Sequence, residues 1–144
     1  MGDIMTPENQ ALIEQVKKFY NTYNETKGSN AADVIDLCAD DIRWQSLGAP
    51  AAGTEFLEDG TGKEKVRTYL RDLYAGWTML HYTVNEFIVS DDRIVILSDV
   101  EFEFDATQKR VATPKADIMH IKDGQITNFF EFYDTAALQA ATLS

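Results

Sequence analysis

Basic residues are scarce in this sequence. Thirteen lysines and arginines stand against 24 aspartates and glutamates, and the formal net charge at pH 7 is -11. Such a charge repels the phosphate backbone of nucleic acids and anionic lipid headgroups. The sequence also lacks a local basic cluster that could offset this repulsion. We therefore expect neither a nucleic-acid partner nor a membrane partner.

Cysteine and cofactor motifs are almost absent. The single cysteine, Cys38, cannot form an internal disulfide, which favours a reducing, cytoplasmic setting. No glycine-rich phosphate-binding loop, nucleophile elbow or metal-ligand spacing occurs, so we expect neither a cofactor nor a metal. A ligand set of Cys38, His81 and His120 is rejected because the three residues fall on separate predicted elements.

Long apolar runs are missing as well. No stretch approaches the roughly 20 apolar residues of a membrane-spanning helix, and the N-terminus has neither the basic nor the apolar part of a signal peptide. Residues Met1–Thr6 fit the loose pattern for N-myristoylation, but Asp3 and the absence of basic neighbours favour a chance match. We expect a protein that is neither exported nor anchored.

What the chain does contain is enough apolar material for a packed interior. Hydrophobic residues make up 44% of the 144 residues and aromatic residues 11%. A chain of this size suits one domain, and it shows no repeat, low-complexity tract or linker. We therefore predict a single domain over residues 1–144.

Helix signals occupy the first half of the chain. A capping threonine, a proline and a following stripe of apolar residues predict a helix from Thr6–Pro7 to about Tyr23, and a short second helix carries Val34–Cys38. After a strand at 42–47 and a loop at 48–60, which contains an exposed-looking Phe56, a third helix is predicted from a Thr61–Glu64 capping box to Trp77.

Strand signals occupy the second half. Four β-rich runs, separated by short turns, predict hairpin-linked antiparallel strands at 80–89, 93–104, 111–121 and 125–133. Asp134 or Thr135 caps a final short helix. Helices followed by a meander of strands give an α+β fold in which the helices cover one face of the sheet.

Two phrases of this sequence carry a family resemblance. Together with the order of elements, Ala39–Trp44 and Ile121–Asp134 resemble the SnoaL-like polyketide cyclases. Ketosteroid isomerases, limonene-epoxide hydrolases and nuclear transport factor two share that superfamily. The resemblance implies a cone-shaped, curved antiparallel (mixed) sheet, with three N-terminal helices enclosing a pocket and a short C-terminal helix.

The resemblance to the isomerases is incomplete at the catalytic positions. Ser46 stands where the general base would be an aspartate, whereas Asp117 matches the acid that hydrogen-bonds the oxyanion. The oxyanion tyrosine corresponds to Phe19, with Tyr20 or Tyr23 as alternatives. Because serine cannot replace the aspartate base, steroid isomerisation is disfavoured.

The epoxide hydrolases offer a second comparison. Glu131 occupies the place of one catalytic aspartate and Asp99 that of another, but Leu97 replaces the arginine of that triad. Alternation along the strand nevertheless groups Asp99 with Glu101, Glu103 and Asp105 on a polar face, which would normally point to solvent.

Asp117 and Glu131 are the leading candidate catalytic residues. A carboxylate aimed into an apolar cone has its pKa raised by desolvation and can act as an acid or a base. Two alternatives stay open: Asp117 could pair with Lys115 on the outer face of the sheet, and Glu131 could be a half-exposed strand residue. His120 is predicted to lie on the opposite face from Asp117.

The candidate pocket residues are mostly aromatic, which suggests a hydrophobic ligand; they are Phe19, Tyr23, Trp44, Ser46, Trp77, Met119, Phe129 and Tyr133. The sequence thus favours a cofactor-independent enzyme of the cyclase, isomerase, dehydratase or epoxide-hydrolase type, in which buried carboxylates act on a hydrophobic small molecule. The alternative is a binding or interaction domain without catalysis.

A homodimer is the remaining prediction. The last strand has aromatic residues on both faces, and Val95 and Leu97 lie opposite the apolar face of their strand. A sheet that is apolar on both sides needs a second cover, and a two-fold partner is the commonest one.

Overall fold

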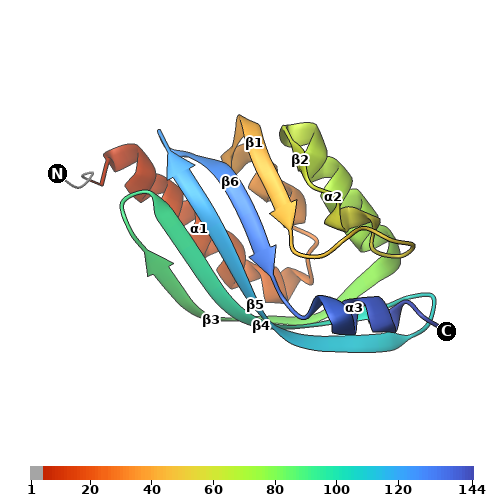
Figure 1. The fold of residues 1–144 in the computed structure, drawn as a ribbon. Helices are drawn as coiled ribbons and strands as arrows, with labels where there is room; N and C mark the ends of the chain where they lie inside the picture. The colour runs from red at the N-terminus through yellow and green to blue at the C-terminus, as the bar shows by residue number, and fades with distance from the viewer. Residues whose placement is uncertain (1–4) are drawn as a thin grey trace.

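The structure, a computed structural model, describes residues 5–144. This part of the chain forms a curved sheet with helices on its concave face (Figure 1). The helical elements are α1 (Pro7–Thr26), the 3-10 helices η1 (Ala31–Leu37) and η2 (Glu55–Leu57), α2 (Lys63–Gly76) and α3 (Thr135–Ala141). The strands are β1 (Cys38–Ser46), β2 (Gly60–Thr61), β3 (Trp77–Val89), β4 (Arg93–Phe104), β5 (Lys109–Lys122) and β6 (Gln125–Phe132).

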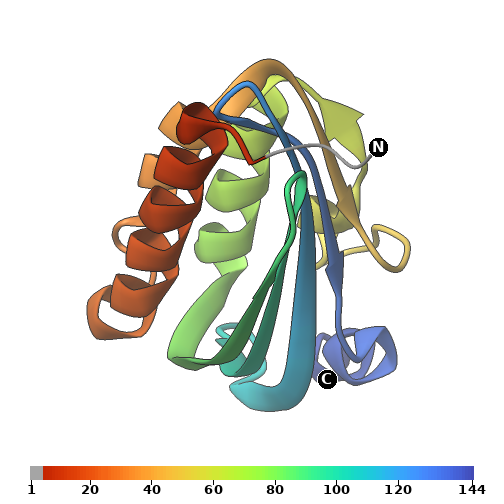
Figure 2. The same ribbon diagram turned by 90° about the vertical axis from the view of Figure 1, so that its left-hand side faces the viewer.

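The six strands form one mixed sheet in the order β2-β1-β6-β5-β4-β3. β3 to β6 are a continuous antiparallel meander, as the short turns predicted, whereas β1 pairs with β6 in parallel. The sheet curves without closing, and α1 and α2 lie on its concave face (Figure 2). The predicted α+β class, the curved sheet and the short C-terminal helix are thereby confirmed.

Local signals account for the helix boundaries that the sequence predicted correctly. The side chain of Thr6 accepts a hydrogen bond from the backbone N–H of Asn9 and caps α1. The side chain of Asp134 does the same for Ala137 at the start of α3. Both caps stabilise N-terminal N–H groups that have no partner within their own helix.

Three boundaries differ from the prediction. The Thr61–Glu64 capping box is wrong, because Thr61 pairs with Arg43 as part of β2 and Gly62 precedes α2 without a side-chain cap. Trp77 does not end the third helix but begins β3. β1 begins at Cys38 rather than at residue 42, so Cys38 is a strand residue and not part of the short second helix as predicted.

Phe56 is also placed differently. It is only 3% exposed, because η2 folds the loop after β1 back over the sheet and packs Phe56 edge-on against Tyr69 at 5.7 Å. The loop therefore contributes to the core instead of presenting an exposed aromatic ring.

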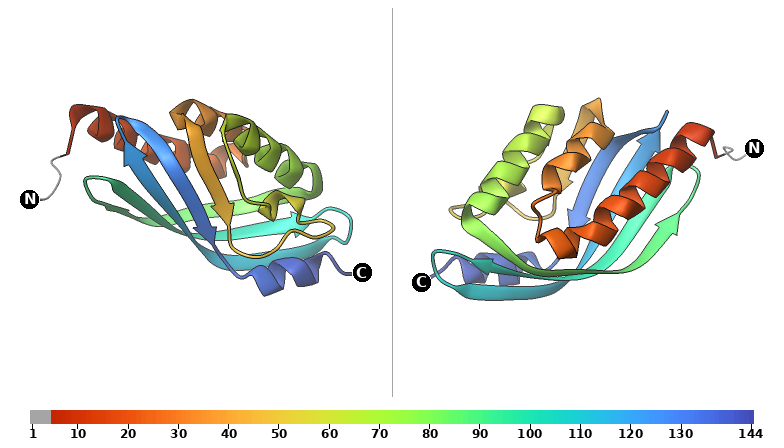
Figure 3. Two further views of the ribbon diagram at one scale, coloured as in Figure 1. Left: turned by 45° about the horizontal axis from the view of Figure 1, so that its top comes forward. Right: turned by 180° about the vertical axis from the view of Figure 1, so that it is seen from behind.

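The hydrophobic core lies between the helices and the concave face; the right-hand view of Figure 3 shows α1, η1 and α2 in front of the strands. The alternating burial of β4 directs Ile94, Ile96 and Val100 inward. No helix within residues 5–144 combines the length and apolar character that crossing a bilayer requires. The myristoylation pattern at Met1–Thr6 lies mostly outside the described residues.

Candidate functional site

A cavity of about 80 Å³ lies between the concave face of the sheet and the helices. Its wall is largely aromatic and aliphatic, with a polar group at one side. By the usual requirement of about 10–15 Å³ per water, it has room for several water molecules. The predicted residues that line it are Phe19, Tyr23, Trp44, Trp77, Asp117, Phe129, Glu131 and Tyr133.

The polar side of the cavity is built by strand register. Glu131 of β6 lies opposite Asp117 of β5 on one side and opposite Ser46 of β1 on the other. Side chains directly opposite one another on a sheet share a face. The three residues therefore form a row across the concave face, and Lys115, two residues before Asp117, points the same way.

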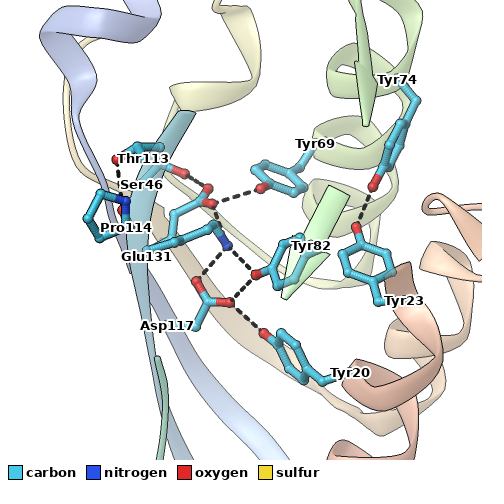
Figure 4. A network of polar contacts seen from close by, with 11 residues as sticks. Tyr20, Tyr23, Ser46, Tyr69, Tyr74, Tyr82, Thr113, Pro114, Asp117 and Glu131 are labelled. Carbon is cyan, nitrogen blue, oxygen red and sulfur yellow. Dashed lines mark hydrogen bonds and ion pairs between the residues drawn. The ribbon is translucent and has the colours of Figure 1, made fainter. Parts of the chain in front are cut away.

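The Lys115 ammonium joins the carboxylates of Asp117 and Glu131, which Figure 4 labels. Its Nζ atom donates to Asp117 Oδ1 at 2.7 Å and lies 3.3 Å from Glu131 Oε1. Both carboxylate side chains are 1% exposed and that of Lys115 is 12% exposed. Two buried negative charges thus share one buried positive charge.

Hydroxyl groups complete the cluster. Tyr20 of α1 and Tyr82 of β3 donate to Asp117 Oδ2 at 2.6 and 3.1 Å, and Lys115 Nζ donates to the Tyr82 hydroxyl at 3.1 Å. At Glu131, Tyr69 of α2 donates to Oε1 at 2.9 Å and Ser46 donates to Oε2. Helices and strands far apart in the chain therefore meet at these two carboxylates.

The electrostatics follow from burial. Burial lowers the pKa of Lys115, but Asp117, Tyr82 and Glu131 raise it more, and the net pKa lies well above the ordinary value. Burial raises the pKa of Glu131, although Lys115, Ser46 and Tyr69 oppose this. The site therefore holds a protonated lysine next to a carboxyl group that is more readily protonated than in water.

Every tyrosine of the chain belongs to this region. Tyr20, Tyr23, Tyr69, Tyr82 and Tyr133 line the cavity, and Tyr74 is hydrogen-bonded to Tyr23 through their hydroxyl groups. Burial is the largest cause of a raised pKa at all six. All six phenols are thus held neutral as hydrogen-bonding groups at neutral pH.

The structure brings some of the predicted residues together and separates others. Asp117 and Glu131 converge, and Ser46 contacts Glu131 without lining the cavity. Met119 is buried in the core but does not line the cavity. Tyr23 contacts Tyr74 rather than a carboxylate.

Asp99 is not part of the site. It is exposed on the convex face of β4, where its carboxylate accepts a hydrogen bond from Asn85 at 2.8 Å. No bulge interrupts the β4–β5 pairing to reverse its direction. Strand alternation was therefore the better guide to its facing than analogy with the epoxide hydrolases.

Lys115, Tyr69 and Tyr82 are the site residues that the sequence did not identify, whereas Tyr20, which contacts Asp117, was one of the alternatives for the oxyanion tyrosine. The possible pairing of Lys115 with Asp117 was anticipated, but on the outer face of the sheet. A signal existed in the alternation of β5, which places Lys115 in phase with the buried Thr113, Asp117 and Met119. A lysine in phase with buried residues indicates a buried ion pair.

The histidines and the cysteine do not form a metal site. No cluster of three or more potential metal-ligating side chains occurs within residues 5–144. His120 is half-buried on the face opposite Asp117, as predicted, and burial followed by Arg93 lowers its pKa. Cys38 is fully buried, and burial raises the pKa of its thiol to about 12, so it is a poor nucleophile.

Comparison with known proteins identifies the family. The model of the SnoaL-like domain matches residues 16–129 of the chain. No curated protein matches the chain in sequence.

Three solved structures illustrate the likeness in fold. An NTF2-like protein from Burkholderia xenovorans LB400 is 17% identical with a TM-score of 0.73, and the alignment covers 93% of this chain and 97% of that one. A protein from Jannaschia sp. CCS1, named as a candidate SnoaL-like polyketide cyclase, is 17% identical with a TM-score of 0.72 and coverages of 97% and 96%.

The third comes from Catenulispora acidiphila DSM 44928. It has a ketosteroid isomerase-like fold, was solved in complex with trimethylamine, and is 17% identical with a TM-score of 0.67 and coverages of 85% and 89%. At these identities the likeness concerns the fold alone.

Proposed function

The chain belongs to the family of SnoaL-like domains, and from this premise we propose that it is a cofactor-independent enzyme that moves a proton on a compact hydrophobic molecule. The observation that carries the proposal is the convergence of Asp117 and Glu131 on Lys115 at the wall of an aromatic cavity. Catalysis by proton transfer requires acid and base groups within mutual reach and partly shielded from water, which this arrangement supplies.

Glu131 is the proposed proton acceptor and donor. Burial raises the pKa of its carboxyl group above the ordinary value, which makes it a stronger proton acceptor than an exposed glutamate. Ser46 and Tyr69 hold its two oxygens, which fixes the direction of the carboxylate. Asp117, the first choice from the sequence, instead anchors Lys115, and the protonated lysine compensates charge at Glu131.

A second function is favoured by one specific observation. Each oxygen of both carboxylates already accepts a hydrogen bond from a protein group. Such a network can serve only to hold the pocket in shape around a bound ligand, in which case the domain binds without catalysing. Kinetics separate the two functions.

The enzymatic proposal predicts that the wild-type protein exchanges carbon-bound hydrogen of a small substrate and that Glu131→Gln does not. Two reactions are suitable: the replacement of α-hydrogens of cyclic ketones by deuterium in D2O, and the opening of the epoxide ring of cyclohexene oxide. We expect the rate of either reaction to fall by about 100-fold or more in Glu131→Gln, because general acid–base catalysis accelerates a reaction by about 10²–10⁴-fold. Proton NMR follows both reactions directly.

Glu86→Gln is the matched control, because Glu86 is exposed on β3 away from the cavity; it should keep the wild-type rate. Asp117→Asn provides a second test of the cluster, and circular dichroism shows that each variant is folded. Equal rates for the wild type and Glu131→Gln on every ketone and on the epoxide would exclude the enzymatic proposal and leave the binding function.

The convex face of the sheet supports the proposal of a homodimer. Strand register places Val95, Ile118 and Phe130 in one row across this face and Leu97, Ala116 and Phe132 in the next. The rings of Phe130 and Phe132 stack at 4.5 Å, and the six side chains are half-buried. A contiguous apolar surface of this kind marks an interface.

Sedimentation equilibrium at micromolar concentration should therefore give twice the 16.2 kDa of one chain. Phe130→Arg should shift the mass to that of the monomer. In a two-fold interface, the introduced guanidinium group would be buried in an apolar surface, close to the same charged group of the partner chain. A monomeric wild-type protein would contradict the prediction. The cytoplasmic setting likewise stays a proposal, consistent with the buried thiol of Cys38.

A further inference from the structure

Two hydrogen-bond donors at the cavity wall have no protein partner. The indole Nε1 of Trp44 and the hydroxyl of Tyr133 are buried, and neither meets an acceptor among residues 5–144. Both side chains line the cavity. Buried polar groups in native proteins are almost always paired, so an unpaired one requires an explanation.

The packing around Trp44 leaves the cavity as the place for its partner. Trp44 is 3% exposed, one face of its ring stacks on Phe129 at 3.9 Å, and Tyr69 packs edge-on at 5.1 Å. Aromatic contacts with β6 and α2 therefore fix the position of the ring, while its N–H group has no acceptor. An indole nitrogen can only donate, so whatever meets it must accept.

Tyr133 lies close to the same polar wall. It follows the last residue of β6 directly, two residues after Glu131, and both side chains line the cavity. Burial and then the charge of Glu131 raise the pKa of its hydroxyl, so the group is a neutral donor at neutral pH. Its hydroxyl can donate to an acceptor in the cavity, as Trp44 can.

The charges of the wall restrict the ligand further. Asp117 and Glu131 carry two negative charges against the single positive charge of Lys115. An anionic ligand would be repelled by this excess. A cationic ligand would meet the Trp44 N–H group, which can only donate, and carboxylate oxygens that each already accept a hydrogen bond from the protein.

We propose that the cavity binds a neutral, compact apolar molecule through an acceptor oxygen, such as that of a carbonyl group, which accepts hydrogen bonds from Trp44 Nε1 and the Tyr133 hydroxyl. The inference rests on the proposed function, because it describes the substrate of the same cavity. It adds a requirement for an acceptor oxygen on the ligand, which neither the carboxylates nor the aromatic lining of the cavity imposes.

The two tryptophans of the chain allow a direct test by NMR. Trp77 also lines the cavity, but its Nε1 donates to the Gly53 carbonyl at 2.8 Å, so its indole N–H is already hydrogen-bonded. Titration with cyclohexanone should move the Trp44 indole proton downfield and leave that of Trp77 nearly unchanged. Trp44→Phe assigns the two signals by removing one of them.

Ligands of the same shape as cyclohexanone distinguish binding by apolar contact with the cavity from binding through a hydrogen bond. Methylenecyclohexane has the shape of cyclohexanone without the oxygen and should not shift the Trp44 signal downfield. Cyclohexanecarboxylate and cyclohexylamine carry the two excluded charges and should bind at least 10-fold more weakly than the ketone. Tighter binding of either charged molecule would overturn the inference.

Substitutions give an independent measurement. Trp44→Phe and Tyr133→Phe should each weaken cyclohexanone binding by about 5- to 10-fold, the usual loss for one neutral hydrogen bond. Neither variant loses a hydrogen bond within the protein, so ligand-free stability should not fall on that account. Ser98→Ala is the matched control, because the Ser98 hydroxyl is equally buried and unpaired but does not line the cavity.

The outcomes distinguish this inference from the proposed function. Glu131→Gln should lose turnover and still bind cyclohexanone through Trp44 and Tyr133. Wild-type binding that is indifferent to Trp44→Phe and Tyr133→Phe would overturn the donor assignment and leave the catalytic proposal standing. Normal ketone binding without any proton exchange would refute catalysis and leave the donor assignment intact.

Discussion

Replacing Lys115 by methionine should lower the free energy of unfolding by about 3–5 kcal/mol at neutral pH, the usual effect of removing one partner from a buried ion pair. Asp117 and Glu131 are each 1% exposed and have no other cation within the salt-bridge distance among the described residues. Without the ammonium, two carboxylates face each other across neighbouring strands in a poorly solvated site.

The loss should depend on pH in a defined direction. In the variant, Glu131 loses the charge of Lys115, which opposes the effect of burial, so its pKa rises further above the unfolded value of about 4. A group with a raised folded pKa contributes stability below its unfolded pKa and loses that contribution as the pH rises. Urea unfolding should therefore show a larger difference between variant and wild type at pH 8 than at pH 5.

Lys122→Met is the matched control, since Lys122 lies on the same strand but is exposed. Removing all three charges in Lys115→Met/Asp117→Asn/Glu131→Gln should recover part of the stability, because no buried charge then remains unpaired. All comparisons require one protein concentration, as a dimer's stability depends on it. A loss below about 1 kcal/mol at both pH values would show that the carboxylates do not need this ion pair.

Alkaline pH should unfold the protein in a single step that releases the protons of all six tyrosines. Burial raises the pKa of Tyr74 to about 12, against the opposing hydrogen bond with Tyr23 and the charge of Lys115. Burial first, and a neighbouring carboxylate second, raise the pKa values of Tyr69 and Tyr20 well above the ordinary value. The unfolded values lie near 10. Stability from these groups is thus fully present below about pH 10 and is lost as the pH rises through the folded values.

Lys115 acts in the same direction, because its folded pKa is also raised and the ion pairs require its proton. The absorbance of phenolate at 295 nm should therefore stay low past pH 10 and then rise together with the loss of the far-ultraviolet circular dichroism. Protein unfolded in guanidinium chloride supplies the reference, in which six phenols titrate near pH 10. Phenols that ionise near pH 10 while the protein stays folded would show that the tyrosine hydroxyl groups are not buried.

The sequence predicted the type and order of the helices and strands better than the residues at which they begin and end. Thr6 and Asp134 are caps that act within a few residues, and the short turns of the meander determine antiparallel pairing, so these features follow from local chemistry. Thr61 failed as a cap because its pairing with Arg43 in β2 is a long-range contact. The prediction that Trp77 belongs to the third helix was wrong, because an apolar residue at this position fits the last position of a helical stripe and the first residue of a strand equally well.

The site was predicted in part. Asp117 and Glu131 were identified by resemblance, and the alternation of β5 and β6 is consistent with their inward facing. Tyr20 was named only as one of three alternatives for the oxyanion tyrosine. Tyr69 and Tyr82 could not be found in the same way, since they come from two other elements and look like ordinary core aromatics in the sequence. Asp99 shows the limit of resemblance, because a matching position on a strand can still lie on the wrong face.

The sequence by itself determined the α+β class, the meander and the aromatic character of the interior, because caps, turns and alternation act over a few residues. Only the tertiary structure decided which groups share the cavity. The parallel pairing of β1 with β6 brings Ser46 beside Glu131, and the packing of α1 and α2 delivers Tyr20 and Tyr69 to the two carboxylates. In this site, helix packing connects Tyr20 with Asp117, 97 positions apart in the chain, and no local pattern encodes such a separation.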